Sequence, residues 1–337
     1  MKTFYSKKIL GDFAKIKKSL QDKNSSLLNE VLSINKMYLK QKRRKYCKNC
    51  LKPIKKISFV SFGVSYSLCK VCNHINGLNE DTDRFLNYLY YSDQKKEKIN
   101  YAKRYLEDYE IKVKNIYLPK AKFLKKIIKK KNIKLLDLGC GGGHFLKACE
   151  NLNIQGSGYD SNKKLIDLAN KKLKKNDVSF AKIEDINRII LNSDGDCISL
   201  ISVLEHIQNP SHFFKIFKKS NFKYIYISIP LFSLTSLLEH SFKNVFPRNL
   251  YGPHTHMYTK ESIYYIIKKN NLKIVGEWWF GSDFSDLSRS LITTSKSKNS
   301  ADYKLLFNKF FYKHIDKLQS VLDKEKLSSD LQIILKK

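Results

Sequence analysis

The segment that most constrains this fold is residues 135–150, where an apolar run passes through a glycine-rich turn into a helix-forming stretch. The run ends around Asp137, and the turn places glycine at alternating positions, Gly139, Gly141 and Gly143. Because glycine lacks a Cβ, such a turn can adopt positive φ and lets a ligand lie against the backbone. A second acid, Asp160, stands about 20 residues further on, where a neighbouring strand should end and ribose hydroxyls could donate to it. Together these features predict a ligand that contains a nucleoside.

The turn has the form Asp-x-Gly-x-Gly-x-Gly, which differs from both the dinucleotide fingerprint and the phosphate-binding loop. It resembles motif I of the class I S-adenosylmethionine-dependent methyltransferases. In that family the glycine loop packs against the methionyl part of the cofactor, the second acid holds the ribose, and an acid after the third strand lies near the adenine amine. The resemblance therefore implies a cofactor site made by Asp137, Gly139, Gly141, Gly143, Asp160 and Glu184. The alternative is a turn that only connects a strand to a helix.

Further apolar runs predict strands at 178–182, 197–204, 224–230, 272–280 and 331–335, and amphipathic segments separate most of them. Alternation of this kind favours an α/β fold with a doubly wound parallel sheet. The resemblance, which covers about residues 121–337, implies a Rossmann-like seven-stranded methyltransferase sheet whose last strand is antiparallel. We expect this domain to occupy 121–294 and 329–337, with a lysine-rich helical insertion at 295–328.

Four cysteines in the N-terminal third form two C-x2-C pairs, separated by residues 51–68: Cys47, Cys50, Cys69 and Cys72. Each pair can point two thiolates at one ion, so two pairs complete a tetrahedral zinc site in a ribbon at 46–80. Disulfides are the alternative. Met1 is followed by mixed charge without an apolar core, so we expect no signal peptide and a cytoplasmic, reducing location, which favours metal. Four thiolates close the coordination shell, which predicts a structural zinc.

A zinc ribbon before a class I methyltransferase resembles bacterial methyltransferases that act on sugars or surface-polysaccharide intermediates. In such proteins the region after the ribbon lids the substrate cleft. We therefore expect a helical linker or lid at 81–120, with a plain solvated connector as the alternative. Residues 1–45 are basic and predicted to be helical.

Two histidines are candidates for contact with the methyl acceptor. His254 and His256 lie in a loop at 252–259, before a predicted helix at 260–270. Residues two apart project to the same side of an extended chain, and an imidazole with a pKa near 7 can take a proton from an acceptor hydroxyl. The alternative is that one of the pair caps a helix or packs.

Glu205 is the third candidate, beside His206 at the end of the fourth predicted strand. The sequence Leu-Glu-His-Ile-x-x-Pro is typical of small-molecule methyltransferases. Related quinone-type enzymes bind a metal with an extra acid three residues before the glutamate. This chain has Ser202 there, so we do not expect a metal at this position.

Residues 276–289 carry both tryptophans of the chain, Trp278 and Trp279, at the end of a predicted strand. The segment resembles a Trp-Trp-Phe-Gly-Thr-Asp stretch of glycan-linked methyltransferases, and aromatic faces stack on sugar rings. Neighbouring strand residues face opposite ways, so we expect one tryptophan to belong to the core.

The charge balance is strongly basic, with 64 Lys and Arg against 31 Asp and Glu and a formal net charge of +33. Basic proteins often bind nucleic acid. Here lysine far outnumbers arginine, whose guanidinium is the group that usually binds phosphates and bases through two hydrogen bonds, and the charge is spread along the whole chain. No apolar run is long enough to predict a membrane span.

The sequence thus predicts an S-adenosylmethionine-dependent methyltransferase with a structural zinc, acting on a sugar or glycan precursor by O- or C-methylation. The partner would be a small-molecule acceptor such as a nucleotide-linked sugar. Two alternatives remain: an RNA methyltransferase that recognises its substrate through the ribbon, and a methyltransferase fold serving as a non-catalytic binding module.

Overall fold

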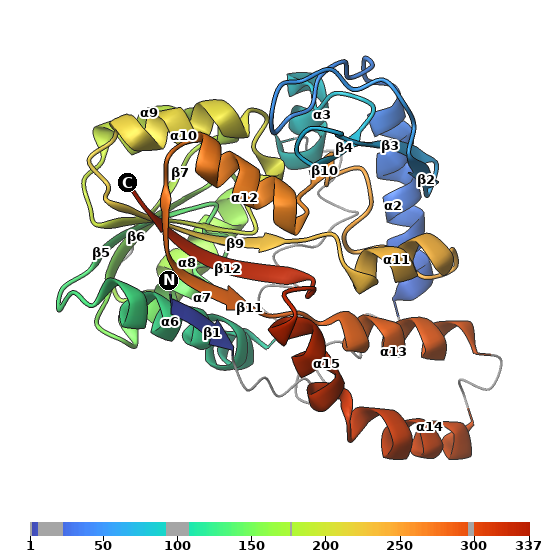
Figure 1. The fold of residues 1–337 in the computed structure, drawn as a ribbon. Coiled ribbons are helices and arrows are strands. Elements are labelled where there is room, and N and C mark those ends of the chain that lie inside the picture. The colour runs from blue at the N-terminus through green and yellow to red at the C-terminus, as the bar shows by residue number, and fades with distance from the viewer. Residues whose placement is uncertain (1, 6–22, 92–107, 176, 296–299) are drawn as a thin grey trace.

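The computed structural model describes residues 2–5, 23–91, 108–175, 177–295 and 300–337, and Figure 1 shows their arrangement. The predicted helical segment 1–45 and the predicted linker 81–120 therefore lie partly outside the described residues. Among the described residues, no helix combines the length and the apolar character that a membrane crossing requires.

The centre of the molecule is a twisted sheet of eight described strands in the order β1-β11-β12-β9-β8-β5-β6-β7. β12 is antiparallel to both its neighbours, β9 and β11, and the other pairings are parallel. The strands are β1 (Lys2–Tyr5), β5 (Lys134–Leu138), β6 (Gln155–Asp160), β7 (Val178–Phe180), β8 (Cys197–Ile201), β9 (Tyr224–Pro230), β11 (Lys273–Trp279) and β12 (Asp330–Lys336).

Helices cover both faces of this sheet, as Figure 1 shows. One face packs against α6 (Leu118–Ile128), α7 (His144–Glu150) and α8 (Lys163–Lys172), and the other against α9 (Ile186–Asn192), α10 (Pro210–Lys219) and α12 (Lys260–Lys269). Successive strand residues alternate between the two cores: Leu135 belongs to the first and Leu136 to the second. Burial on both faces explains why the strands read as almost continuous apolar runs.

The predicted fold class is confirmed: an α/β sheet whose last strand is antiparallel, with seven strands in the predicted arrangement. One feature was not predicted. β1 adds parallel to β11 at the edge of the sheet, although the surrounding residues 1–45 are predicted to be helical. A four-residue strand carries too little periodicity to be recognised without its partner.

The N-terminal module, as we call residues 24–80, lies at one end of the sheet. It begins with α2 (Asn24–Leu39) and continues into a small antiparallel sheet of β2 (Phe59–Ser61), β3 (Val64–Leu68) and β4 (Ile75–Gly77). The fourth strand of this small sheet, β10 (His256–Met257), comes from a distant part of the chain. A short α3 (Asp83–Leu86) and a π-helical turn at Asn87–Tyr91 follow the module.

The other α-helices of the described residues are α5 (Tyr109–Lys112), α11 (Leu234–Ser241), α13 (Asp283–Thr294), α14 (Ala301–Phe307) and α15 (Ile315–Lys324). The predicted helical insertion at 295–328 corresponds to α14 and α15, which hang below the sheet in Figure 1. Leu305, Phe310 and Val321 of this part are more than half exposed.

Candidate functional site

A cleft of about 370 Å³ opens at the carboxyl ends of β5, β6 and β8. Open α/β sheets bind their ligands at this edge. The cleft is lined by residues of these strand ends, of the Asn87–Tyr91 turn and of the loop that precedes β10: Leu89, Tyr90, Leu138, Gly139, Tyr159, Asp160, Ser161, Asn162, Leu165, Ala181, Lys182, Ile183, Ile186, Ser202, Val203, His206, Tyr251, Pro253 and His254.

The glycine turn forms one wall of this cleft. Gly139 has φ of +71°, and a Cβ at this position would lie 2.6 Å from a methyl carbon of Val203. The backbone N–H groups of Gly139 and Cys140 donate to the carbonyl of Tyr159 at 2.8 and 3.1 Å, which fixes the turn against the end of β6. Only glycine satisfies both the backbone angle and the close approach at residue 139.

Asp160 faces the cleft from the end of β6. Its Oδ2 accepts from the N–H of Gly141 and its Oδ1 from the N–H of Asn162, both at 2.8 Å. Burial raises the pKa of this carboxyl above its usual value, and the backbone donors oppose that shift. Each carboxylate oxygen can accept more than one hydrogen bond, so Asp160 is oriented and retains capacity for ribose hydroxyls.

The other two acids of the predicted cofactor site do not line the cleft. Asp137 is buried beneath the turn, where the hydroxyl of Ser199 donates to its Oδ1 at 2.6 Å and burial raises its pKa to about 7. Glu184 has a side chain that is 56% exposed and lies 3.7 Å from the ammonium of Lys182. Contact of either acid with the cofactor stays a prediction.

Glu205, His206 and His254 meet at the opposite side of the cleft, where their ligand-type atoms lie within 4.8 Å of one another. The Nδ1 of His254 lies 2.9 Å from the carbonyl of Asn249. A carbonyl only accepts, so Nδ1 carries the proton and Nε2 offers a lone pair. Burial lowers the pKa of His254 to about 4 and that of His206 to about 3, and both imidazoles are therefore neutral at pH 7.

Glu205 is almost completely buried, and its Oε2 has no hydrogen-bond partner among the described residues. Burial raises its pKa to about 8. Lys120 also lies beneath this part of the cleft, where its ammonium donates to the hydroxyl of Ser228 at 2.8 Å and burial lowers its pKa. Lys120 was not predicted, because it is one of four lysines in α6 and only its place beside Ala121 and Leu124 on the apolar side of the helix distinguishes it.

The structure separates the two histidines of the 252–259 loop. His254 lines the cleft, whereas His256 is fully buried and its Nδ1 lies 2.8 Å from Nε2 of His74. The expectation that they project to one side requires an extended backbone, and the chain bends at Thr255 between them.

Trp278 and Trp279 are both buried, on opposite faces of β11. The indole N–H of Trp279 donates to Glu277 at 2.8 Å, and Asp283, Asp286 and Arg289 are buried too. Neither tryptophan lines the cleft. We expected one tryptophan in the core, and the structure places both there, because helices cover both faces of β11.

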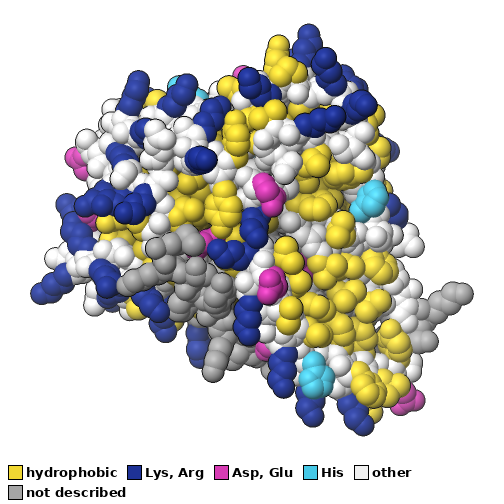
Figure 2. All heavy atoms as spheres, in the orientation of Figure 1, with side chains coloured by type: hydrophobic (Ala, Val, Ile, Leu, Met, Phe, Trp, Pro, Cys, Tyr) yellow, Lys and Arg dark blue, Asp and Glu magenta, His cyan; other side chains and the backbone are white. Residues whose placement is uncertain are grey.

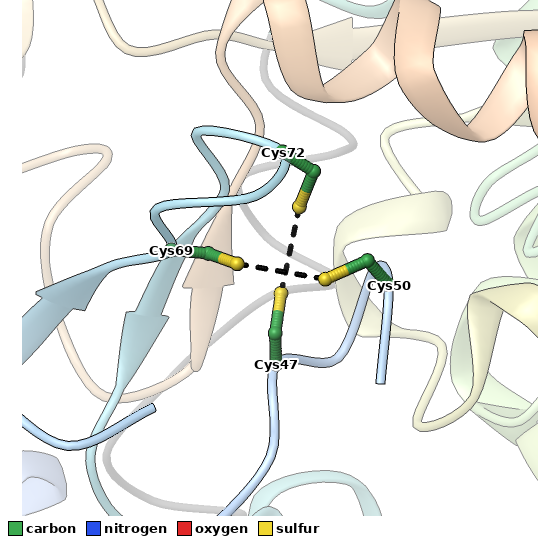
Figure 3. A group of neighbouring side chains, drawn as sticks. All are labelled: Cys47, Cys50, Cys69 and Cys72. Carbon is green, nitrogen blue, oxygen red and sulfur yellow. Dashed lines mark hydrogen bonds between the residues drawn. The ribbon is translucent and has the colours of Figure 1, made fainter. Parts of the chain in front are cut away.

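The four cysteines of the N-terminal module converge on one point, as Figure 3 shows. The Sγ atoms of Cys47 and Cys72 lie 3.7 Å apart, and those of Cys50 and Cys69 lie 3.5 Å apart. Four thiolates about 2.3 Å from a central zinc have sulfur–sulfur distances close to this, so the cluster fits the ion. The hydrogen bond between the sulfur atoms of Cys47 and Cys72 lowers the pKa of Cys47 to about 5.

The family model described as a methyltransferase domain matches residues 109–277. The chain belongs to the methyltransferase domain family. This membership confirms the predicted enzyme class, an S-adenosylmethionine-dependent methyltransferase. None of the curated proteins matches this sequence.

Two similar solved structures are also methyltransferases. A SAM-dependent methyltransferase from Archaeoglobus fulgidus shares 22% identity over 69% of this chain and 100% of its own, with a TM-score of 0.41. The plantazolicin methyltransferase BpumL in complex with SAH shares 17% identity over 75% of this chain and 93% of its own, with a TM-score of 0.43.

Proposed function

We propose that this methyltransferase transfers the methyl group of S-adenosylmethionine to a sugar or glycan precursor, by O- or C-methylation. The observation that carries the proposal is a single cleft that joins Gly139 and Asp160 on one side with His206 and His254 on the other. Methyl transfer needs donor and nucleophile held in line within one enclosed site, and such positioning supplies much of the rate.

The cofactor half of the cleft suits a nucleoside. Asp160 can accept from ribose hydroxyls, the backbone of Gly139 lines the part of the cleft proposed for the methionyl group, and the side chains of Ile183 and Ile186 offer apolar surface to a base. When bound, the cofactor supplies an electrophilic methyl group. The chain's part is to hold the cofactor and to exclude water around it.

The acceptor half offers a neutral base. His254 has an unprotonated Nε2 at pH 7. Its pKa of about 4, rather than the expected value near 7, makes it a weaker base than a free imidazole, but it can still accept the proton that an acceptor hydroxyl releases as it attacks the methyl group. Tyr90, Tyr251 and the imidazole of His206 line the same half, and aromatic faces of this kind stack on sugar rings. This pairing of base and aromatic rings supports a sugar as the acceptor.

We further propose that the four-cysteine cluster binds a structural zinc. Four cysteine ligands leave no coordination position for a substrate, so the ion would stabilise the fold of the ribbon rather than take part in the transfer.

The test is transfer of label from methyl-labelled S-adenosylmethionine to a panel of nucleotide-linked sugars, with total RNA as the competing acceptor class. We expect label in a nucleotide sugar, and we expect His254→Asn to lower the rate by about 10²–10⁴-fold, the usual contribution of a general base. Label found only in RNA would overturn the sugar proposal and favour the RNA alternative.

A further inference from the structure

The loop that carries His254 is tied to the N-terminal module. The N–H of Gly252 donates to the side-chain oxygen of Asn35 in α2 at 2.7 Å, and the N–H of Gly77 donates to the carbonyl of Thr255 at 2.9 Å. β10 then pairs with β4, so that His256 stands opposite Asn76 and Met257 opposite Ile75. His254 is therefore held between two attachments to the module.

Strand β4, which pairs with β10, also contacts the cysteine cluster directly through one residue, Asn76. The side-chain amide of Asn76, on β4, donates to the Sγ of Cys47 at 3.5 Å, and its side-chain oxygen accepts from the N–H of Lys48 at 2.9 Å. Asn76 is fully buried, so these bonds are shielded from water. The strand that pairs with β10 is thus fixed directly to a cysteine of the predicted zinc site.

A buried pair of histidines joins the two segments a second time. Nε2 of His74 and Nδ1 of His256 are 2.8 Å apart, and His74 also approaches the hydroxyl of Ser262 at 3.3 Å. The side-chain amide of Asn49, from the first cysteine pair, donates to the carbonyl of Ser262 at 2.8 Å. Both knuckles of the ribbon therefore contact the segment around β10.

The loop that carries Glu205 and His206 is attached to the residues that directly follow the module. The side-chain amide of Gln208, three residues beyond Glu205, donates to the carbonyl of Asp81 at 2.8 Å and to the carboxylate of Asp83 at 3.0 Å. Asp81 is itself held by ion pairs with Arg44 and Lys48 of the module. The loop that bears Glu205 and His206 thereby shares its support with the loop that bears His254.

The cofactor half has a different support. The hydrogen bonds described above that hold Gly139, Gly141 and Asp160 all come from the ends of β5 and β6 and the turns that follow them. The two halves of the cleft are thus attached to different parts of the fold.

We propose that the N-terminal module is a positioning element for the acceptor half of the cleft: it holds His254 through the β4–β10 pairing and the His74–His256 bond, and loading of the four-cysteine site with metal is required for this. His74, Asn76 and His256 are positioning residues. The inference rests on the proposed function only in naming the substrate that this half receives. The cofactor half does not depend on the module.

The first test compares His256→Ala with His256→Asn in the full-length, zinc-loaded protein. Asparagine keeps a polar atom near the position of Nδ1, so it should preserve the bond to His74, whereas alanine removes it. Amide hydrogen exchange followed by mass spectrometry should show residues 251–257 exchanging roughly tenfold faster in the alanine variant, as for loss of one buried hydrogen bond. The asparagine variant should behave as the wild type.

One further measurement separates the possible outcomes. Calorimetric titration with S-adenosylhomocysteine should give the same affinity in wild type and His256→Ala. Equal exchange of 251–257 in both variants, or a parallel loss of S-adenosylhomocysteine affinity, would overturn the inference. Failure of the wild type to bind S-adenosylhomocysteine would instead contradict the proposed function, so the two failures are distinguishable.

Gly77→Ala provides a second route should His256→Ala not fold. A Cβ at residue 77 would clash with the hydroxyl of Tyr38 in α2 and would lie 2.9 Å from the carbonyl oxygen of Thr255, so it would displace the module's contacts with the loop that precedes β10. Val60→Thr, on the opposite edge strand β2, is the matched control, because it changes the same small sheet away from β10. Faster exchange at 251–257 is expected in Gly77→Ala only, and the same increase in Val60→Thr would contradict a local effect.

Metal removal completes the test. Chelation should release about one zinc ion per chain and accelerate exchange at 251–257 while S-adenosylhomocysteine affinity is retained. Release of zinc without a change at 251–257 would show that the loop does not depend on the metal.

Discussion

At the scale of single residues, the carboxylate of Asp160 and the backbone of the glycine turn at Gly139 define the cofactor half of the cleft. Asp160 is held by backbone N–H groups of Gly141 and Asn162, so its orientation does not depend on ligand. A group that is oriented before binding loses less conformational entropy when the ligand arrives. This arrangement makes Asp160 the most informative residue to change.

Asp160→Ala is expected to weaken binding of S-adenosylhomocysteine by about 1.5–3 kcal/mol, the contribution of hydrogen bonds to a charged group. Calorimetric titration measures the change. Asp167→Ala is the matched control, because Asp167 is exposed on the helix that follows and does not line the cleft. Equal affinity in the wild type and Asp160→Ala would contradict the ribose assignment.

Glu205 makes a pH-dependent prediction. Burial raises its pKa from 4.5 to about 8 in the folded protein, so between these values the folded state binds the proton more strongly than the unfolded chain. Stability from this group is therefore fully present below about pH 4.5 and is lost as the pH rises through about 8.

Glu205→Gln should remove this dependence, since glutamine does not titrate. Urea unfolding at several pH values is expected to show a steeper loss of stability with rising pH in the wild type than in Glu205→Gln. Parallel profiles for the two proteins would show that Glu205 is ionised in the folded state.

At the scale of secondary-structure elements, buried ion pairs join the C-terminal helices to the rest of the protein. The Nη1 of Arg248, after α11, donates to both carboxylate oxygens of Asp286 in α13 at 2.9 and 2.6 Å. Arg289, one turn further along α13, lies 3.5 Å from the same carboxylate and is 3% exposed. One aspartate of α13 therefore pairs with two arginines, Arg248 from the segment after α11 and Arg289 from α13 itself.

Asp286→Ala is expected to destabilise the protein by about 3–5 kcal/mol, because it leaves the buried Arg289 without its counter-charge. Chemical unfolding measures the loss. Asp316→Ala, on the first turn of α15, is a comparison that removes an acid from the same region at an exposed position. A loss below about 1 kcal/mol for Asp286→Ala, the range of surface pairs, would show that water reaches this contact.

At the scale of the whole molecule, the excess of positive charge is the dominant feature. Figure 2 shows Lys and Arg side chains spread over the visible face rather than gathered into one stripe. A diffuse net charge of +33 repels itself in the folded state and is screened by salt. On the face that Figure 2 shows, the charge therefore affects stability without gathering into a continuous basic stripe.

Raising the ionic strength from about 0.01 M to about 0.15 M shortens the screening length from about 30 Å to about 8 Å. We expect the melting temperature to rise by several degrees over this range, while affinity for S-adenosylhomocysteine stays constant. Differential scanning calorimetry with and without salt makes the measurement, and sucrose serves as an uncharged control. A melting temperature independent of salt would show that the charges are already compensated.

The sequence by itself determined the fold class, the glycine turn with Asp160, and the convergence of four cysteines. These features are local: strand and helix periodicity, positive φ at Gly139 and the spacing within each C-x2-C pair depend on residues close together in the chain. Their physical causes act within a few residues, which is why the pattern can be recognised without coordinates.

Only the tertiary structure decided which side chains face the cleft. The bend at Thr255 directs His254 into the cleft and His256 toward the ribbon, and helices on both faces of β11 enclose Trp278 and Trp279. The addition of β10 to β4 joins residues almost two hundred positions apart. Such pairings depend on contacts between distant segments, whose energies leave no periodic signal in either segment alone.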